Sequence, residues 1–232
     1  MPPRALEPAG VALVDKPAGP SSFAVVAQIR RVTQARTGHA GTLDPFATGL
    51  LVVLSGRATK LAPCLVGLDK RYRTDVDLTA RTSTGDPEGE VVERPEPPSL
   101  RELEQRLERL RGEIELPIPA ASAVKIGGER AYRLARRGID VEMPSRRSTV
   151  HALDVITYMG DADRVTQVTL DLHVSSGTYV RAIADTLGGH CRTLRRTEVG
   201  PFSVGAAVPP DAFEPSRLIP EAEVLAQLGV PA

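Results

Sequence analysis

The chain has 232 residues, 41% of them apolar and 25% charged, a composition typical of an ordinary soluble protein with one large core. Its 29 basic and 29 acidic residues cancel, so the total charge does not indicate a polyanionic partner. The N-terminal sequence MPPRALEPAG has no apolar signal region, and no apolar run reaches the roughly 18 residues of a spanning helix, so we expect a cytoplasmic protein that does not cross a membrane.

The first part of the chain predicts two strands separated by a helix and an irregular loop. The strand VALVDK ends at Pro17, and Ser21 or Ser22 then caps a helix. The apolar face of this helix is formed by Val25, Val26, Ile29 and Val32. The loop GHAGTLDPFATG at 38–49 leads into LLVVLSG, whose β-branched residues predict a buried strand, and a short helix is expected at about 58–68.

A strand, a turn and an acidic helix are predicted next. KRYRTDVDLTA alternates as a half-buried strand does, and TGDPEGE has the composition of a turn. In PPSLRELEQRLERLRGE, Ser99 and Glu102 match a capping box, and a leucine stripe ends at Gly112. The outer face of this helix is acidic, which places it away from any polyanion.

The rest of the chain predicts an insertion, two strands and a helix. Residues 117–147 are basic without clear periodicity, so we expect a mobile insertion at the edge of the domain. STVHALDVI and VTLDLHV return to strands, and SSGTYVRAIADTLGGH turns into a helix with Ser176 or Thr178 near its cap and Arg181 in its first turn. A last strand is expected near 199–204, before a proline-rich tail. Strands that are distant in sequence and flank short helices favour an α+β fold.

Cysteine and histidine spacing argues against cross-links and metals. Cys64 and Cys191 belong to no C-x-x-C pair, so we expect two reduced, buried thiols. The four histidines form no H-E-x-x-H or other ligand spacing, so the sequence predicts no metal site.

Charge is distributed unevenly along the chain. Residues 1–60 contain seven basic and three acidic residues, residues 120–150 contain the same numbers, and residues 85–114 contain five basic and nine acidic residues. This division fits a molecule with one face toward an anion, although solvated helix faces would give the same pattern.

Asp44, in the loop 38–49, has two interpretations. An aspartate before a proline commonly stabilises its own turn. Three other stretches, however, also set a charged or aromatic residue in turn chemistry beside a buried strand: DKPAGPSS, DKRYR and SSGTYVRAIADTLG. The four stretches together favour a functional site that includes Asp44.

These stretches, together with GHAGTLDPFATGLL and LRRTEVGPFSV, resemble the bacterial tRNA pseudouridine-55 synthases of the TruB type, from about residue 10 to 205. The resemblance implies a pseudouridine synthase fold, with a mixed, largely antiparallel central sheet flanked by helices and loops and with a thumb-like insertion. It also implies isomerisation of uridine to pseudouridine at position 55, in the T-loop of tRNA, on a flipped-out nucleotide and without a cofactor.

The resemblance assigns the chemistry to three residues. Asp44 matches the catalytic aspartate, Tyr72 the tyrosine that stacks on the uracil, and Arg181 the arginine that pairs with the aspartate. The chemistry agrees, because isomerisation replaces an N–C glycosidic bond by a C–C bond without consuming water and needs no second carboxylate to handle water. Asp44 would attack C1′ or remove a ribose proton, a guanidinium favours its charged form, and a tyrosine offers a π-face to the detached base.

Other matches concern the pocket and the RNA. His39 matches a histidine that fills space around the flipped nucleotide, Leu194 an apolar wall of the pocket, and Lys16 and Pro17 a lysine-proline motif near the catalytic loop. Residues 120–148 match a thumb-like insertion that closes on the RNA stem-loop. The basic residues of this insertion are candidate RNA contacts: Lys125, Arg130, Arg133, Arg136 and Arg137.

The expected organisation is one catalytic domain, residues 1–205, followed by a short tail, residues 206–232. Many members of the family carry a C-terminal RNA-binding PUA domain, for which this tail is too short. The expected partner is the T-arm stem-loop of tRNA. We expect a monomer with no obligatory protein partner.

Two alternatives remain open. A non-catalytic tRNA-folding factor of the same fold would lack the set of Asp44, Tyr72 and Arg181, which this chain retains. A nucleoside hydrolase that uses one carboxylate would release free uracil.

Overall fold

The computed structural model describes residues 8–122, 124–131, 134, 137, 139 and 141–230. The chain forms two compact units: unit 1 comprises Met1–Tyr72 and Arg195–Ala232, and unit 2 comprises Arg73–Leu194. Among the described residues, no helix is long and apolar enough to span a bilayer.

Unit 1 is built on an antiparallel pair of strands, β1 (Gly10–Lys16) and β3 (Thr48–Ser55), which are in register along the whole of β1. The strand β2 (Thr37–His39) pairs antiparallel with the end of β3, and β12 (His190–Val199) pairs in parallel with its start. A short strand, β13 (Phe202–Ser203), folds back on β12. The irregular loop between β2 and β3 therefore begins and ends on paired strands.

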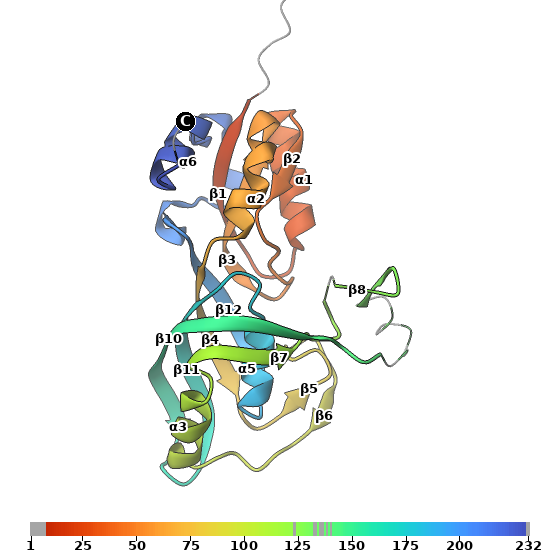
Figure 1. Ribbon diagram of the computed structural model, residues 1–232, viewed down its shortest axis with the longest axis vertical. Helices are drawn as coiled ribbons and strands as arrows, with labels where there is room; N and C mark the ends of the chain where they lie inside the picture. The colour runs from red at the N-terminus through yellow and green to blue at the C-terminus, as the bar shows by residue number, and fades with distance from the viewer. Residues whose placement is uncertain are drawn as a thin grey trace, which may run out of the picture. The chain divides into compact units, whose positions relative to one another are not determined.

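Both faces of the β1–β3 pair are buried, which explains the unbroken apolar run in β3. One face packs against α1 (Ser22–Thr33), and the other packs against η1 (Gly56–Leu61), α2 (Ala62–Val66) and α6 (Glu221–Gln227). In Figure 1 the orange helices α1 and α2 and the blue helix α6 lie around β1 and β3. The predicted buried strand and the short helical segment after it are confirmed.

Helix α1 begins where Ser21 accepts a hydrogen bond from Ala24 N at 3.1 Å. Three of the four predicted apolar positions are buried, but Val32 is 40% exposed, so its assignment to the buried face was wrong. The last turn of the helix buries Thr33 instead. The helix ends at Gln34, which adopts a left-handed conformation with φ of 52°.

The proline-rich tail completes the core of unit 1. Val208 and Ile219 form bridges to Val14 and Val11 of β1, and Phe213 packs into the same core as α1. Three short 3-10 turns precede α6: η2 (Val204–Ala206), η3 (Pro210–Ala212) and η4 (Pro215–Arg217).

Unit 2 contains a sheet in the order β12, β4, β11, β10, β7. These strands are β4 (Lys70–Asp77), β7 (Gly112–Pro117), β10 (Ser145–Gly160) and β11 (Val165–Val174). Strand β10 pairs antiparallel with both β11 and β7, and β11 alternates buried and half-buried side chains along most of its length, as predicted. The mixed sheet and its flanking helices confirm the predicted α+β fold.

Two helices pack on unit 2, near the positions that the sequence predicted. Helix α3 (Leu100–Glu108) has the predicted capping box, in which Ser99 and Glu102 bond reciprocally. Helix α5 (Val180–Thr186) has Tyr179 at its N-cap without a side-chain bond. Thr178, expected near the cap, directly precedes it, and its hydroxyl donates to Ser175 O at 2.9 Å. Two hairpins complete the unit, β5 (Arg81–Thr82) with β6 (Val91–Glu93) and β8 (Lys125–Ile126) with β9 (Glu129–Arg130).

The sequence missed one long strand and misplaced one thiol. The strand predicted near 199–204 is present as β13, but the strand β12 at 190–199, whose polar residues do not alternate regularly with its buried ones, was not predicted. Cys64 is exposed on α2 rather than buried, while Cys191 is buried as expected.

Candidate active site

Asp44 lies half-buried in residues 40–47, the irregular segment between β2 and β3, which we call the Asp44 loop. Its carbonyl accepts a hydrogen bond from Ala47 N at 3.2 Å, so a tight turn follows the aspartate directly. Side chains from three other segments bond to the backbone of this loop, and together they fix the chain on both sides of Asp44.

Lys16 holds the second half of the Asp44 loop. Its side chain is buried at the end of β1, where Nζ donates to Pro45 O at 3.0 Å and to Ala47 O at 2.7 Å. A third bond goes to Pro17 O at 2.9 Å. A buried ammonium needs acceptors for all three of its hydrogens, and these carbonyls supply them. Lys16 and Pro17 therefore lie beside the backbone that follows Asp44.

Arg196 of β12 holds the first half of the loop. Its guanidinium is buried and donates from Nη2 to Gly41 O at 3.0 Å, from Nη1 to Thr42 O at 3.4 Å, and from Nε to Leu50 O at 2.8 Å. A planar group bound at three points has one orientation. Sequence reasoning quoted this residue within LRRTEVGPFSV but gave it no role, because a buried arginine cannot be recognised by spacing.

Ser22 fixes the residue directly before Asp44. Its buried hydroxyl accepts from Leu43 N and donates to Leu43 O, both at 2.8 Å. On the other side of Asp44, Gly19 N donates to Pro45 O at 2.9 Å. Sequence reasoning considered Ser22 only as a helix cap, a role that the structure gives to Ser21.

The buried arginine affects the titration of two neighbours. Burial, and then the charge of Arg196, lower the pKa of His39, so its imidazole is neutral at pH 7; its Nδ1 is buried and has no hydrogen-bond partner among the described residues. Burial lowers the pKa of Lys70 to about 8, Arg196 acts in the same direction, and Asp69 opposes them. The Lys70 ammonium donates to two carbonyls of the preceding turn, at 2.7 and 2.5 Å.

The remaining predicted residues are divided between the two units. Tyr72 is buried in β4, on the strand face that also buries Lys70. Unit 1 contains Lys16, Pro17, His39, Asp44 and Tyr72, and unit 2 contains Arg181 and Leu194. Leu194 is buried in β12. The structure thus brings Lys16 and Pro17 to the Asp44 loop, and the assigned partnership of Asp44 with Arg181 stays a prediction.

Arg181 is 3% exposed in the first turn of α5 and is held by the turn between β5 and β6. Its Nη1 donates to Thr84 O at 2.6 Å and lies 3.5 Å from Asp86 Oδ2, and its Nη2 donates to Ala121 O at 2.9 Å. Gly85 allows this approach, because its φ is +71° and an added Cβ would lie 3.3 Å from the Cβ of Arg181. The guanidinium is therefore fixed in unit 2 by one carboxylate and two carbonyls.

Asp86 is itself 4% exposed and oriented by its own turn. Its Oδ1 accepts from the Thr84 hydroxyl at 2.5 Å and from Glu88 N at 3.1 Å. A buried carboxylate whose oxygens are bonded in this way is a suitable partner for a buried guanidinium. Sequence reasoning treated TGDPEGE only as a turn and missed Asp86.

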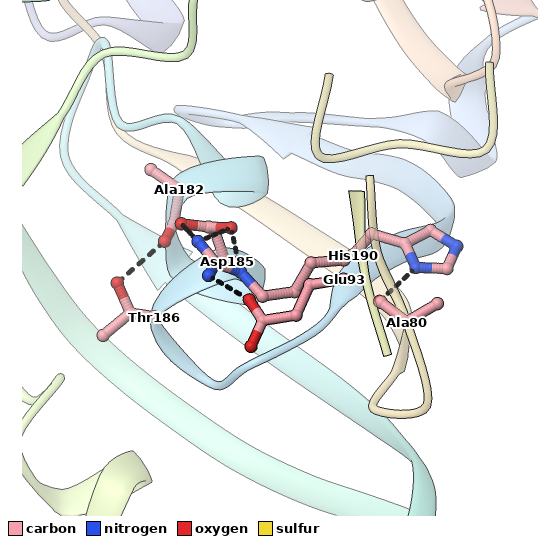
Figure 2. Close-up of polar contacts among 7 residues, drawn as sticks. Ala80, Glu93, Ala182, Asp185, Thr186 and His190 are labelled. Atoms are coloured by element: carbon pink, nitrogen blue, oxygen red, sulfur yellow. Dashed lines mark hydrogen bonds and ion pairs between the residues drawn. The ribbon is translucent and has the colours of Figure 1, made fainter. Parts of the chain in front are cut away.

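A second ion pair anchors the helix that carries Arg181. Nε and Nη2 of Arg81 donate to the two carboxylate oxygens of Asp185 at 2.9 and 3.0 Å, and Nη1 donates to Glu93 at 2.8 Å (Figure 2). After the helix, His190 Nδ1 lies 2.9 Å from Ala80 O, which joins the start of β12 to the same region (Figure 2). Both ends of α5 are thus tied to the β5–β6 hairpin and the residue before it.

The predicted RNA contacts of the insertion are described in part. Lys125 and Arg130 face each other in the β8–β9 hairpin, and Arg137 donates to Glu129 at 2.7 Å. Two of the predicted contacts, Arg133 and Arg136, lie outside the described residues.

Comparison with known proteins places these features in a family. A model of the TruB family pseudouridylate synthases (N-terminal domain) matches residues 30–180. The chain is 43% identical over 215 residues to tRNA pseudouridine synthase B of Corynebacterium jeikeium (strain K411), across 87% of this chain and 70% of that protein. It is 40% identical over 234 residues to tRNA pseudouridine synthase B of Bordetella avium (strain 197N), across 96% and 93%.

Solved structures share the fold at lower identity. A chain of a Cbf5-Nop10-Gar1 complex superposes with a TM-score of 0.69 and 24% identity, over 98% of this chain and 68% of that one. A chain of an H/ACA RNP bound to a substrate RNA containing 2′-deoxyuridine superposes with a TM-score of 0.62 and 24% identity, over 88% of this chain and 51% of that one. The family match and the two close relatives together show that the chain belongs to the TruB family of pseudouridylate synthases.

Proposed function

We propose that this chain isomerises uridine to pseudouridine at position 55, in the T-loop of tRNA, with Asp44 as its catalytic carboxylate. The family and the names of the relatives make the chain a tRNA pseudouridine synthase, which is an isomerase. We further propose that it acts in the cytoplasm as a monomer on the T-arm stem-loop.

The observation that carries the proposal is the set of contacts around Asp44. Ser22 fixes the residue before it, and Lys16 fixes the carbonyl after it, so the backbone that carries the carboxylate has little freedom. A carboxylate that acts at a single atom of a bound nucleotide gains its effect from such positioning. A turn that served only its own stability would not need a buried ammonium and a buried guanidinium to hold its carbonyls.

The proposed reaction begins with a uridine that has left the loop stack. Asp44 then attacks C1′, or removes a ribose proton, as the bond from C1′ to N1 breaks. The uracil turns and a bond forms from C1′ to C5, while the bond from Asp44 to C1′ breaks or, on the other route, the removed ribose proton returns. The hydrogen on C5 then leaves as a proton, and N1 takes up a proton. Atoms balance without water, so one carboxylate suffices.

The other proposed roles follow from chemistry and the family resemblance. Tyr72 presents a π-face to the detached uracil, and Leu194 forms an apolar wall. Arg181 pairs with the Asp44 carboxylate, a role that rests on the family resemblance. His39, neutral at pH 7, fills space without adding a charge.

The test is tritium release from T-arm RNA that contains C5-tritiated uridine, since forming the new bond displaces that hydrogen. Asp44→Asn keeps the size of the side chain but supplies neither a nucleophilic carboxylate nor a useful base, so we expect no release above background. RNA affinity should stay within about tenfold of wild type, or about 1.4 kcal/mol, because phosphates and stacking supply most of it.

Asp211→Asn, at an exposed aspartate of unit 1, is the matched control and should behave as wild type. Turnover by Asp44→Asn at a rate comparable with wild type would reduce Asp44 to a turn residue. Release of free uracil by the wild type would identify a hydrolase, and binding without tritium release would identify a folding factor. Should Asp44→Asn fail to fold, Asp44→Ala answers the same question.

A further inference from the structure

The solvent face of α1 carries an aromatic side chain that the core does not use. Phe23 is 77% exposed, more than any other large apolar side chain that the structure describes. The chain contains only four phenylalanines, and Phe202 and Phe213 are buried. A ring that is mostly exposed forgoes most of the stabilisation that burial would give and leaves a π-face open to solvent.

Phe23 is next in the chain to a residue that contacts the Asp44 loop. It follows Ser22, whose hydroxyl makes both hydrogen bonds to Leu43, the residue before Asp44. It precedes Ala24, whose N–H bonds to the helix cap at Ser21. The ring is therefore attached to a rigid helical turn, one residue away from a contact that fixes the proposed catalytic loop.

The same side of α1 is basic. Ala27, Arg30 and Gln34 follow Phe23 at helical spacing, Arg31 lies beside them, and both arginines are exposed. The helix sequence SFAVVAQIRRVT contains no acidic residue. At about 1.5 Å per residue the arginines lie roughly 10 to 12 Å along the axis from Phe23, and about three stacked nucleotides at roughly 3.4 Å each cover that length.

The opposite face of α1 has a different character. Val25, Val26 and Ile29 pack there with Phe213, whose neighbours Asp211 and Glu214 are exposed and acidic. An anion is therefore favoured at the outer face and disfavoured near that segment. A protein partner would need a broader apolar surface than one ring surrounded by alanines and arginines provides.

We propose that the outer face of α1 is an RNA-binding surface, on which Phe23 stacks with an unpaired base of the substrate loop next to the target nucleotide while Arg30 and Arg31 contact the phosphates that follow. Base stacking on an exposed aromatic ring and phosphate contacts to nearby arginines are the two elements of single-strand binding. The proposal rests on the proposed function for the identity of the RNA, and it assigns a surface outside the residues that carry the reaction.

The test uses the absence of tryptophan from the chain. Phe23→Trp places a single indole at the proposed stacking position, and T-arm stem-loop RNA should quench its emission on saturation. Val66→Trp, at a side chain 43% exposed on α2, is the matched control and should keep its emission. An unchanged emission of Phe23→Trp in a saturated complex overturns the proposal.

Affinity provides the second readout. Phe23→Ala should weaken binding of the T-arm RNA by about tenfold, which is within the range for loss of one stacked base, and Phe23→Tyr should restore it to within about twofold. Arg30→Gln combined with Arg31→Gln should reduce the slope of log affinity against log salt by about 1.4. Wild-type affinity for Phe23→Ala, or a wild-type slope for the double variant, contradicts the surface.

The outcomes separate this surface from the proposed function. If the wild type releases tritium from the same RNA while Phe23→Trp is not quenched, the activity stands and the α1 surface is wrong. If Phe23→Trp is quenched while the wild type releases no tritium, the surface stands and the proposed reaction is wrong. Because Phe23 is exposed, melting temperatures of its variants should match wild type, which excludes misfolding as the cause.

Discussion

Asp86 and Arg181 form a buried ion pair between a turn and a helix that are far apart in the sequence. Breaking such a pair by removing one partner commonly costs about 3 to 5 kcal/mol, because the other charge is left buried without compensation. The sequence could not indicate the pair, since an aspartate in TGDPEGE is first explained by the turn itself. Only the fold places that turn against the first residues of α5.

Asp86→Asn tests the ion pair by replacing one carboxylate oxygen with an amide nitrogen, which removes the negative charge. The amide retains an acceptor for the Thr84 hydroxyl but presents no charge to Arg181, so we expect a lower melting temperature and slower tritium release with RNA affinity little changed. Asp185→Asn is the control, because Asp185 is 40% exposed and pairs with Arg81 at the surface. Its effect on unfolding should stay below about 1 kcal/mol. Equal losses of stability and of tritium release in the two variants would show that the buried pair contributes no more than the surface pair.

Lys70 makes the stability of the chain depend on pH in a definite direction. Burial lowers its folded pKa to about 8, against 10.5 as the ordinary value. Below pH 8 both folded and unfolded chains hold the proton, and the folded chain bears the cost of a buried ammonium. Between pH 8 and 10.5 the unfolded chain holds the proton that the folded chain has lost, so this residue favours folding increasingly as pH rises.

Lys70→Met should remove that dependence. Between pH 7 and 9 the wild type should gain about 1 kcal/mol of unfolding free energy that the variant does not gain, because one unit of pH above the folded pKa corresponds to about 1.4 kcal/mol. Denaturant unfolding of both proteins at the two pH values measures the difference. Parallel pH profiles would mean that Lys70 is not titrated in this range.

At the scale of elements, two adjacent serines have different structural roles beside the Asp44 loop. Ser21 caps α1 through Ala24 N, whereas Ser22 bonds to both backbone groups of Leu43. The sequence left open which serine caps the helix, because both residue types and positions fit a cap. Only the loop, which arrives from further along the chain, distinguishes them.

Ser22→Ala and Ser21→Ala should therefore have different consequences. Ser22→Ala leaves the buried N–H of Leu43 without its acceptor and loosens the residue before Asp44, so we expect single-turnover tritium release to fall by about tenfold or more with RNA affinity retained. Ser21→Ala should cost about 1 kcal/mol of stability through the lost cap and leave turnover near wild type. The opposite ranking in turnover would show that Ser22 does not support the Asp44 loop during the reaction.

Several elements of this fold could be predicted from periodicity and turn chemistry, whereas β7, β12 and α6 were not predicted. Strand β3, the capping box of α3 and the alternation of β11 all depend on local patterns, and each was predicted. Strand β12 was not, because Arg195 and Arg196 in its middle resemble a solvated segment. Arg196 is buried where it binds two carbonyls of the Asp44 loop. Because that loop is distant in the sequence, no local pattern around Arg196 indicates the contact.

At the scale of the whole molecule, unit 1 is formed by two stretches that are distant in the sequence. Residues 195–232 join the first 72 residues in unit 1, and bridges to Val11 and Val14 of β1 tie the tail to it. Such long-range pairing has no local signal, so the sequence described the end of the chain only as a proline-rich tail. The candidate site shares this property: its motifs were visible in the sequence, but their supporting residues come from other segments.

The uneven charge along the chain predicts which basic residues matter for RNA. Lys125→Gln combined with Arg130→Gln, in the hairpin of the basic insertion, should weaken binding of T-arm RNA and reduce the salt slope by between about 1.4 and 1.8. Arg111→Gln is the control, because Arg111 follows the acidic helix α3 and pairs with Glu108 at 3.2 Å. Its salt slope should equal that of wild type. An unchanged slope for the double variant would remove the hairpin from the RNA interface.

The side chains that hold the Asp44 loop bind its main-chain atoms, and every amino acid offers the same carbonyl. These hydrogen bonds therefore do not depend on which side chains stand at Thr42 and Phe46. Gly41 and Gly49 are restricted, because their φ angles are +105° and +101°. An added Cβ at Gly49 would also lie 2.2 Å from Arg196 O. A library randomised at Thr42 and Phe46 should keep its fold, whereas one at Gly49 should not. The backbone geometry of the Asp44 loop can thus stay unchanged while the side chains on its surface change.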